Sequence, residues 1–157
     1  MKNRKNKKKK GFTLIELVIV LAVMAIIALI AIPNFTAIRD NSKDKADASS
    51  LDVVERNILM LVSDGTLTTH TTDNVFKATF ATAGAKADVT SHKGSLTDDE
   101  VSKVNEALKN VTQPQGHVQG AKDANGKRPI PTSKAKAKAI KVTVKPNGDV
   151  IAETVAA

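Results

Sequence analysis

The chain has no cysteine, no tryptophan, no tyrosine and only four phenylalanines among its 157 residues. Without cysteine it can form no disulfide bond and no thiolate metal site, and it can perform no thiol catalysis. With so few aromatic side chains, a hydrophobic core must be built mainly from aliphatic ones and is expected to be modest. These absences exclude disulfide-stabilised scaffolds and cysteine-dependent enzymes.

Acidic residues are missing from the N-terminal tip. Residues 1–11 contain seven lysines or arginines and no aspartate or glutamate, in a chain whose formal net charge is +8. The remaining chain has 17 basic residues against 16 acidic ones. The excess positive charge therefore belongs to the tip, and it does not by itself indicate a nucleic-acid-binding protein.

A long apolar run follows this basic tip. Phe12 to Ile32 is 21 residues, and residues 17–32 include no polar side chain. A helix of this length spans roughly 30 Å, the thickness of the hydrocarbon core of a bilayer. A helix that is apolar on every side must be buried in protein or in lipid, and a chain this small cannot surround it. The basic tip predicts a cytoplasmic N-terminus, with residues 33–157 outside.

Two simpler interpretations of this segment are a secretory signal peptide and an uncleaved signal anchor. A secretory signal peptide would have an apolar stretch of about 7–15 residues followed by a small-x-small cleavage site. This run is longer, and it ends Ile32-Pro33-Asn34-Phe35 without such a site. An uncleaved signal anchor fits better, but it does not explain Glu16, the fifth residue after Gly11. An intramembrane carboxylate is expected to have a function and a partner.

The helical pattern continues beyond the apolar run. Residues 34–62 contain no proline or glycine, and apolar side chains recur at helical spacing at Leu51, Val54, Ile58 and Leu61. Ser63-Asp64-Gly65 is typical of a helix end. We therefore expect one helix from Phe12 to Val62. A bend is expected at Pro33, because proline removes one backbone hydrogen bond and crowds the preceding turn.

Residues 63–157 are expected to form a small globular head with an antiparallel β-sheet, which makes the fold class α+β. The pattern predicts a strand within 74–82, a capped helix within 97–111, a loop over 112–138, and a β-hairpin within 138–156 that turns at 146–149. The helix has Thr97 and Glu100 at capping-box spacing.

No catalytic, metal or cofactor site is evident in the sequence. His70, His92 and His117 lie far apart and lack ligand spacing, so no metal is expected. Residues 120–127 depart from a phosphate-binding loop in the glycine spacing and in the residue after the lysine. We therefore expect a protein that is not an enzyme and that uses no cofactor.

A second basic segment lies in the head. Residues 127–145 contain seven basic residues and no acidic one. A solvated basic loop is the simplest interpretation, and a weak contact with a polyanion is the alternative. The segment has no aromatic side chains to stack on bases, so binding to nucleic acid stays undecided at this point.

The stretch Lys10-Gly11-Phe12-Thr13-Leu14-Ile15-Glu16, followed by the apolar run and Pro33, resembles the N-terminus of type IV prepilins. The resemblance covers about the first 35 residues. It implies that residues 1–11 are a leader removed after Gly11 by prepilin peptidase, which then methylates the new amine of Phe12. It also implies that residues 12–32 are a transmembrane and fibre-core helix, that 33–62 continue this helix, and that 63–157 are the head.

The resemblance implies a structural subunit of a type IV pilus. The precursor lies in the cytoplasmic membrane with its head outside, and the mature protein forms a surface filament for adhesion or twitching motility. Its implied partners are other copies of the chain, the peptidase and methyltransferase, and the assembly platform with its ATPase. Within the fibre, Glu16 of one subunit is implied to pair with the Phe12 amine of the next.

Two alternatives stay open at this point. A pseudopilin of a type II secretion or DNA-uptake system shares this N-terminus, although major secretion pseudopilins usually have an acidic calcium loop where this chain is basic. The other alternative is a signal-anchored binding module that never polymerises. The chain also has Ala25 where many relatives have glycine. Its missing disulfide and its Lys- and Asn-rich leader make it similar to pilins of Gram-positive, clostridia-like bacteria.

Overall fold

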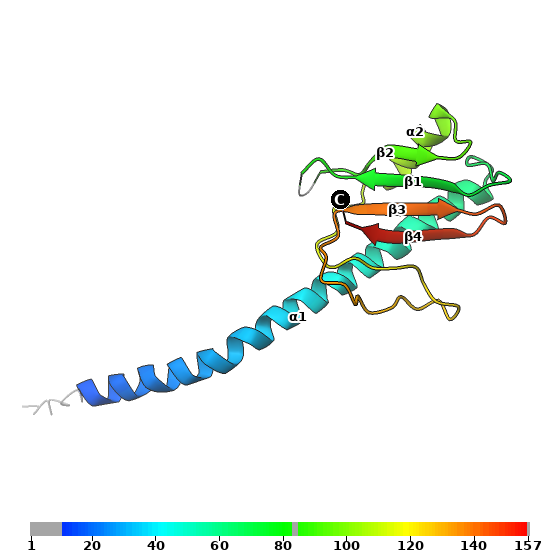
Figure 1. Cartoon of the computed structure of the whole chain (residues 1–157). Coiled ribbons are helices and arrows are strands. Elements are labelled where there is room, and N and C mark those ends of the chain that lie inside the picture. The colour runs from blue at the N-terminus through cyan, green and yellow to red at the C-terminus, as the bar shows by residue number, and fades with distance from the viewer. Residues whose placement is uncertain (1–10, 83–84, 157) are drawn as a thin grey trace, which may run out of the picture. The chain divides into compact units, whose positions relative to one another are not determined.

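The computed structural model describes residues 11–82 and 85–156, except for the side chains of residues 33, 34 and 91. The elements in chain order are α1 (Leu14–Ser63), β1 (Asn74–Thr79), β2 (Asp88–Lys93), α2 (Asp98–Leu108), β3 (Ala139–Val144) and β4 (Val150–Val155), as Figure 1 shows. The expected α+β class, with a long N-terminal helix and an antiparallel sheet, is confirmed. The chain divides into two compact units, Met1–Arg39 and Asp40–Ala157.

Helix α1 begins at Leu14, two residues later than the apolar pattern predicted. The reason is that Thr13 and Glu16 form hydrogen bonds that cap the first turn. The helix ends at Ser63, and Gly65 follows with a φ of 76°, a conformation that favours glycine. Pro33 lies within α1. Its side chain falls outside the described residues, and the bend there stays a prediction.

The four strands form one antiparallel sheet in the order β2-β1-β3-β4. β1 alternates buried and half-buried residues, as the pattern over 74–82 predicted. β3 and β4 form the predicted hairpin, and Gly148 in its turn has a φ of 87°. β2 was not predicted from the sequence. Its residues are mostly polar because it is an edge strand, so the period-2 pattern is weak there.

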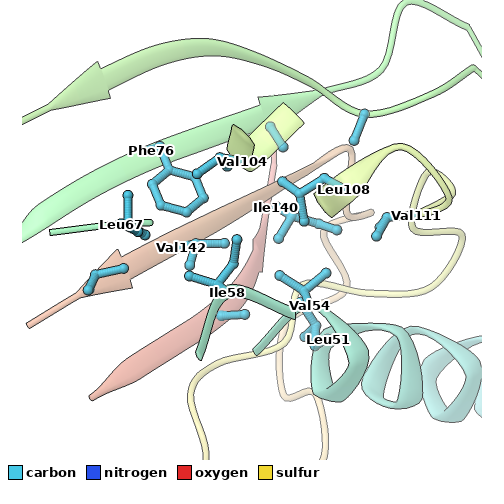
Figure 2. Packing of buried hydrophobic residues seen from close by; sticks show 14 residues of the cluster. Leu51, Val54, Ile58, Leu67, Phe76, Val104, Leu108, Val111, Ile140 and Val142 are labelled. Atoms are coloured by element: carbon cyan, nitrogen blue, oxygen red, sulfur yellow. The ribbon is translucent and has the colours of Figure 1, made fainter. Parts of the chain in front are cut away.

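The core of the head lies between the last turns of α1, helix α2 and one face of the sheet (Figure 2). Phe76 is its largest buried side chain, and aliphatic residues surround it. The other large, fully buried members are Leu51, Val54, Ile58, Leu67, Val104, Leu108, Ile140, Val142 and Val144. Each such burial stabilises the fold by about 1.5–3 kcal/mol before chain entropy is counted, so α1 is an integral part of the head.

Both edges of the sheet have side-chain or loop partners. On β4, the Ala152 amide donates to Glu55 Oε1 at 3.1 Å, and the Thr154 amide donates to the Gln119 carbonyl at 3.0 Å. On β2, the Val89 amide donates to Asn105 Oδ1 at 2.9 Å. These contacts satisfy backbone groups that an edge strand otherwise presents to neighbouring molecules.

Two carboxylates of α1 hold the beginning of the loop over 112–138. Asp47 accepts from the amides of Gln115, at 3.1 Å, and Gly116, at 2.7 Å, and Asp44 accepts from the amide of His117 at 2.7 Å. A side chain on Gly116 would overlap Asp44 Oδ1. Burial raises the pKa of Asp47, and the hydrogen bonds from Gly116 and Gln115 only partly offset this. The loop therefore packs closely on α1, although it has no strand or helix of its own.

A group of charges holds the middle of the same loop. The Arg128 side chain is buried; it donates from Nη2 to Glu55 Oε1 at 2.7 Å and from Nη1 to the Ala152 carbonyl at 2.7 Å. Lys122 Nζ lies 2.8 Å from Glu55 Oε2 and 3.0 Å from Asp52 Oδ1. The hydrogen bonds to Glu55 and Asp52 raise the pKa of Lys122. We call Arg128, Lys122, Asp52 and Glu55 the charge clasp, because they join the loop to α1 and β4.

Candidate processing and assembly site

The N-terminal half of α1 presents its apolar side chains to the outside. From Phe12 to Ile32 the large apolar side chains are 49–87% exposed. One helix among the described residues is long and apolar enough to cross a membrane, and its most apolar window is not buried at all. An exposed apolar surface of this size needs lipid or other protein chains to cover it.

The Gly11–Phe12 bond lies in an exposed segment before α1. Gly11 and Phe12 are both exposed, and a Cβ added to Gly11 would have no atom within 4 Å. Glycine without a side chain lets an extended backbone pass close to the catalytic groups of a protease. The geometry is compatible with processing at this bond, and the cleavage itself stays a prediction.

Glu16 forms a capping box with Thr13. The Thr13 amide and hydroxyl donate to Glu16 Oε2 at 2.8 and 2.7 Å, and the Glu16 amide donates to Thr13 Oγ1 at 3.4 Å. The carboxylate thereby satisfies donors that the first turn of a helix leaves unpaired, and its charge is favourable beside the positive end of the helix dipole.

The role of Thr13 was not predicted. A Thr-x-x-Glu spacing directly before an apolar run is the recognised signature of a capping box, and Thr13 and Glu16 have this spacing. This spacing is the signal from which the cap could have been predicted. In the described residues Oε1 of Glu16 accepts no hydrogen bond, which leaves one carboxylate oxygen for a second partner.

Two histidines of the head have local partners. In the described parts of the chain, no group of three or more His, Asp or Glu side chains is placed to hold a metal ion. His117 Nδ1 lies 3.1 Å from Asp44 Oδ2, and His70 Nε2 lies 3.1 Å from Thr68 Oγ1. Both histidines thus have structural partners.

Comparison with known families gives one match. Residues 6–32 match the model of the prokaryotic N-terminal methylation motif. Neither the curated proteins nor the solved structures gave a match to this chain. The matched residues include the Gly11–Phe12 bond, Glu16 and the exposed apolar run. This motif implies processing by prepilin peptidase and assembly into pilus-type machinery, and its families are structural proteins rather than enzymes. Over residues 6–32 the chain thus carries the type IV prepilin signature, on a helix suited to anchor a precursor in a membrane.

Proposed function

We propose that the chain is a structural subunit of a type IV pilus. The precursor is inserted in the membrane, cleaved after Gly11 and methylated on the nitrogen of Phe12, and it then polymerises through the apolar half of α1. The observation that carries this proposal is the position of Glu16 within the matched motif, at the start of an exposed apolar helix.

The free energy of membrane insertion supports the first step. Fourteen Leu, Ile, Val and Phe residues lie between Phe12 and Ile32. At about −0.3 to −0.6 kcal/mol each they contribute roughly −4 to −8 kcal/mol. A charge at the centre of a bilayer helix costs about 2.5–3.5 kcal/mol, and less near its end, where Glu16 lies. Membrane insertion thus tolerates Glu16, and the proposed assembly step gives its carboxylate a function.

The proposed assembly step pairs Glu16 with a positive amine. Cleavage after Gly11 creates this amine on Phe12, and methylation keeps it cationic. Thr13 holds Glu16 Oε2 at the helix end, and Oε1 is left to accept from the Phe12 amine of a neighbouring subunit. An unpaired charge in an apolar fibre core is strongly disfavoured, so this pair sets the axial register as well as the attraction between subunits.

The maturation step is tested on protein sheared from the cell surface. Intact-mass and N-terminal peptide analysis should find a chain that begins at Phe12 and carries one methyl group. Gly11→Val fills the space beside the cleaved bond and should leave the precursor uncut. Lys10→Gln is the matched control, since it changes the neighbouring residue without filling that space. A mature chain that begins at Met1, or at any residue after Ile32, contradicts the proposal.

A pseudopilin of a type II secretion or DNA-uptake system is the second candidate. It is favoured by the motif itself, since pseudopilins share it with pilins. The basic segment over 127–145 speaks against a secretion pseudopilin with an acidic calcium loop. Immuno-electron microscopy with an antibody to the head separates the two: a pilus subunit labels long surface fibres along their length, and a pseudopilin does not.

A further inference from the structure

Three lysines of the head alternate with alanines in an extended segment. Lys134, Lys136 and Lys138, which we call the lysine row, are exposed, whereas Ala137 and Ala139 are 4% and 1% exposed. Backbone hydrogen bonds hold the segment, from Val118 N to Ala135 O, from Ala137 N to Gly116 O, and from Lys138 N to Val155 O. Lys136 forms an isolated β-bridge with His117, and β3 begins at Ala139, so the three charges lie close together along the backbone just before β3.

The charge of the row is only partly neutralised within the head. Lys134 and Lys138 form no ion pair with the residues that the structure describes, and residues 127–145 contain no acidic side chain. Lys136 Nζ lies 3.7 Å from Asp40 Oδ1, where both side chains remain about half exposed. Arg128 does not contribute to this surface, because it is buried in the charge clasp. The row is therefore a set of exposed positive charges on a backbone that hydrogen bonds hold in place.

We infer that the lysine row binds the phosphate backbone of double-stranded DNA without regard to base sequence. Lysines act on phosphates as point charges, and such contacts carry no sequence information. Residues 112–157 contain no phenylalanine, tyrosine or tryptophan, and the imidazole of His117 lies 3.1 Å from Asp44 and 3.3 Å from Lys136 Nζ. Binding of single strands typically requires aromatic stacking, which this surface lacks, so the duplex is the favoured form.

Repetition makes this contact effective, and here the inference rests on the proposed function. Three lysines on one head bind a polyanion weakly. A fibre repeats the row once per subunit, so that a DNA molecule bound at one row meets the next at a high effective concentration. Fibres should therefore bind DNA much more tightly than dispersed subunits do.

The test uses sheared fibres of the full-length protein and a fluorescent duplex of mixed sequence over 50–200 mM salt. Lys134→Gln with Lys138→Gln should form normal fibres, bind at least about tenfold more weakly at 150 mM salt, and reduce the salt slope by about 2 for each bound subunit. Lys86→Gln with Lys103→Gln is the control of equal charge change, at exposed lysines outside the row. It should bind as the wild type does.

Several outcomes overturn the inference. Equal binding by row variant and wild type shows that the row is not the site. Retention of a sulfated glycan or poly-glutamate but not of DNA shows a different partner. If the wild type forms no fibres, the proposed function fails, and the row is then tested with detergent-extracted protein coupled densely to beads. Loss of DNA capture on beads in the row variant alone supports the inference, and equal capture overturns it.

Discussion

The single carboxylate of Glu16 has two roles, one observed within the chain and one proposed between subunits. One oxygen accepts from Thr13 in the isolated chain, and the other is available to the amine proposed on Phe12. A local cap and a contact between subunits thus share one side chain. The two roles are separable by substitution.

We predict that Glu16→Ala leaves insertion and cleavage intact but abolishes fibres or reduces them severely. Glu16→Gln should have nearly the same effect, because it keeps the shape and removes the charge that the amine requires. Fibre yield in a shear fraction is measured beside the membrane pool by immunoblot. Normal fibres from both variants would show that the carboxylate has no role in assembly.

Thr13→Val is the matched control for the cap. It keeps the side-chain shape and removes only the hydroxyl that contacts Glu16, at a cost of about 1 kcal/mol of helix stability. It should reduce the yield of fibres less than Glu16→Ala does, and Thr13→Ser should restore it. If Thr13→Val is as damaging as Glu16→Ala, the cap rather than the pairing explains the loss.

Glu100 is a buried charge that the head stabilises by hydrogen bonding. The side chain accepts from the amides and hydroxyls of Thr68 and Thr97, four donors in all. Burial by itself raises the pKa of Glu100, but these hydrogen bonds outweigh it and lower the pKa from 4.5 to about 2. The ionised form of Glu100 is therefore favoured in the folded head. Its hydrogen bonds link α2 to the segment that follows α1.

We predict that Glu100→Gln destabilises the head by roughly 2–3 kcal/mol at pH 7. Because the folded-state pKa lies below the ordinary value, the stabilisation is complete above about pH 4.5 and is lost as pH falls toward about 2. Thermal unfolding of a head fragment that starts at Asp40, followed by circular dichroism, measures the difference. Asp98→Asn, an exposed change in the same first turn, should lose little. A constant difference from pH 7 to pH 2 would be contrary to this account.

At the scale of elements, the helices and strands that are marked by patterns within a short stretch of sequence were predictable. The helical stripe ending at Gly65, the capping box of α2 and the turn at 146–149 all lie within short stretches of sequence. β2 was missed because its polar residues follow no clear alternation. The contacts of the loop over 112–138 with α1 could not be predicted, since partners such as Gln115 and Asp47, or Arg128 and Asp52, are 68 and 76 residues apart in sequence. For the candidate site, the motif was visible in the sequence, whereas the hydrogen bonds of Thr13 were not inferred.

We predict that Arg128→Met destabilises the head by about 3 kcal/mol. Methionine fills the space but leaves Glu55 with Lys122 and the Ala152 amide as its partners, and loss of one member of a buried ion pair is costly. Urea unfolding of the fragment that starts at Asp40 measures this loss. Lys127→Met, an exposed neighbour, is the control and should change stability little. Equal stability of both variants would mean that the charge clasp contributes no net free energy.

At the scale of the whole molecule, the compact unit that contains the head begins at Asp40, so Asp44 and Asp47 lie inside it. We predict that residues 40–157 fold as a soluble monomer whose melting temperature is unchanged by reducing agent. A fragment that starts at Leu51 lacks both loop-holding carboxylates and should melt at a lower temperature. Equal melting temperatures of the two fragments would show that these contacts do not contribute to the stability of the head.

A filament brings many identical sheets close together, and this is the condition under which exposed strands join into cross-β aggregates. The amides of Ala152 and Thr154 are occupied by Glu55 and Gln119, and that of Val89 by Asn105. A neighbouring copy therefore cannot pair with these three amides unless it displaces their present partners. Growth by strand addition is disfavoured at these positions, which agrees with the proposed polymerisation through the apolar helix. If the proposed polymer is held in this way, its disassembly would return folded subunits to the membrane, which the disassembly of an amyloid would not do.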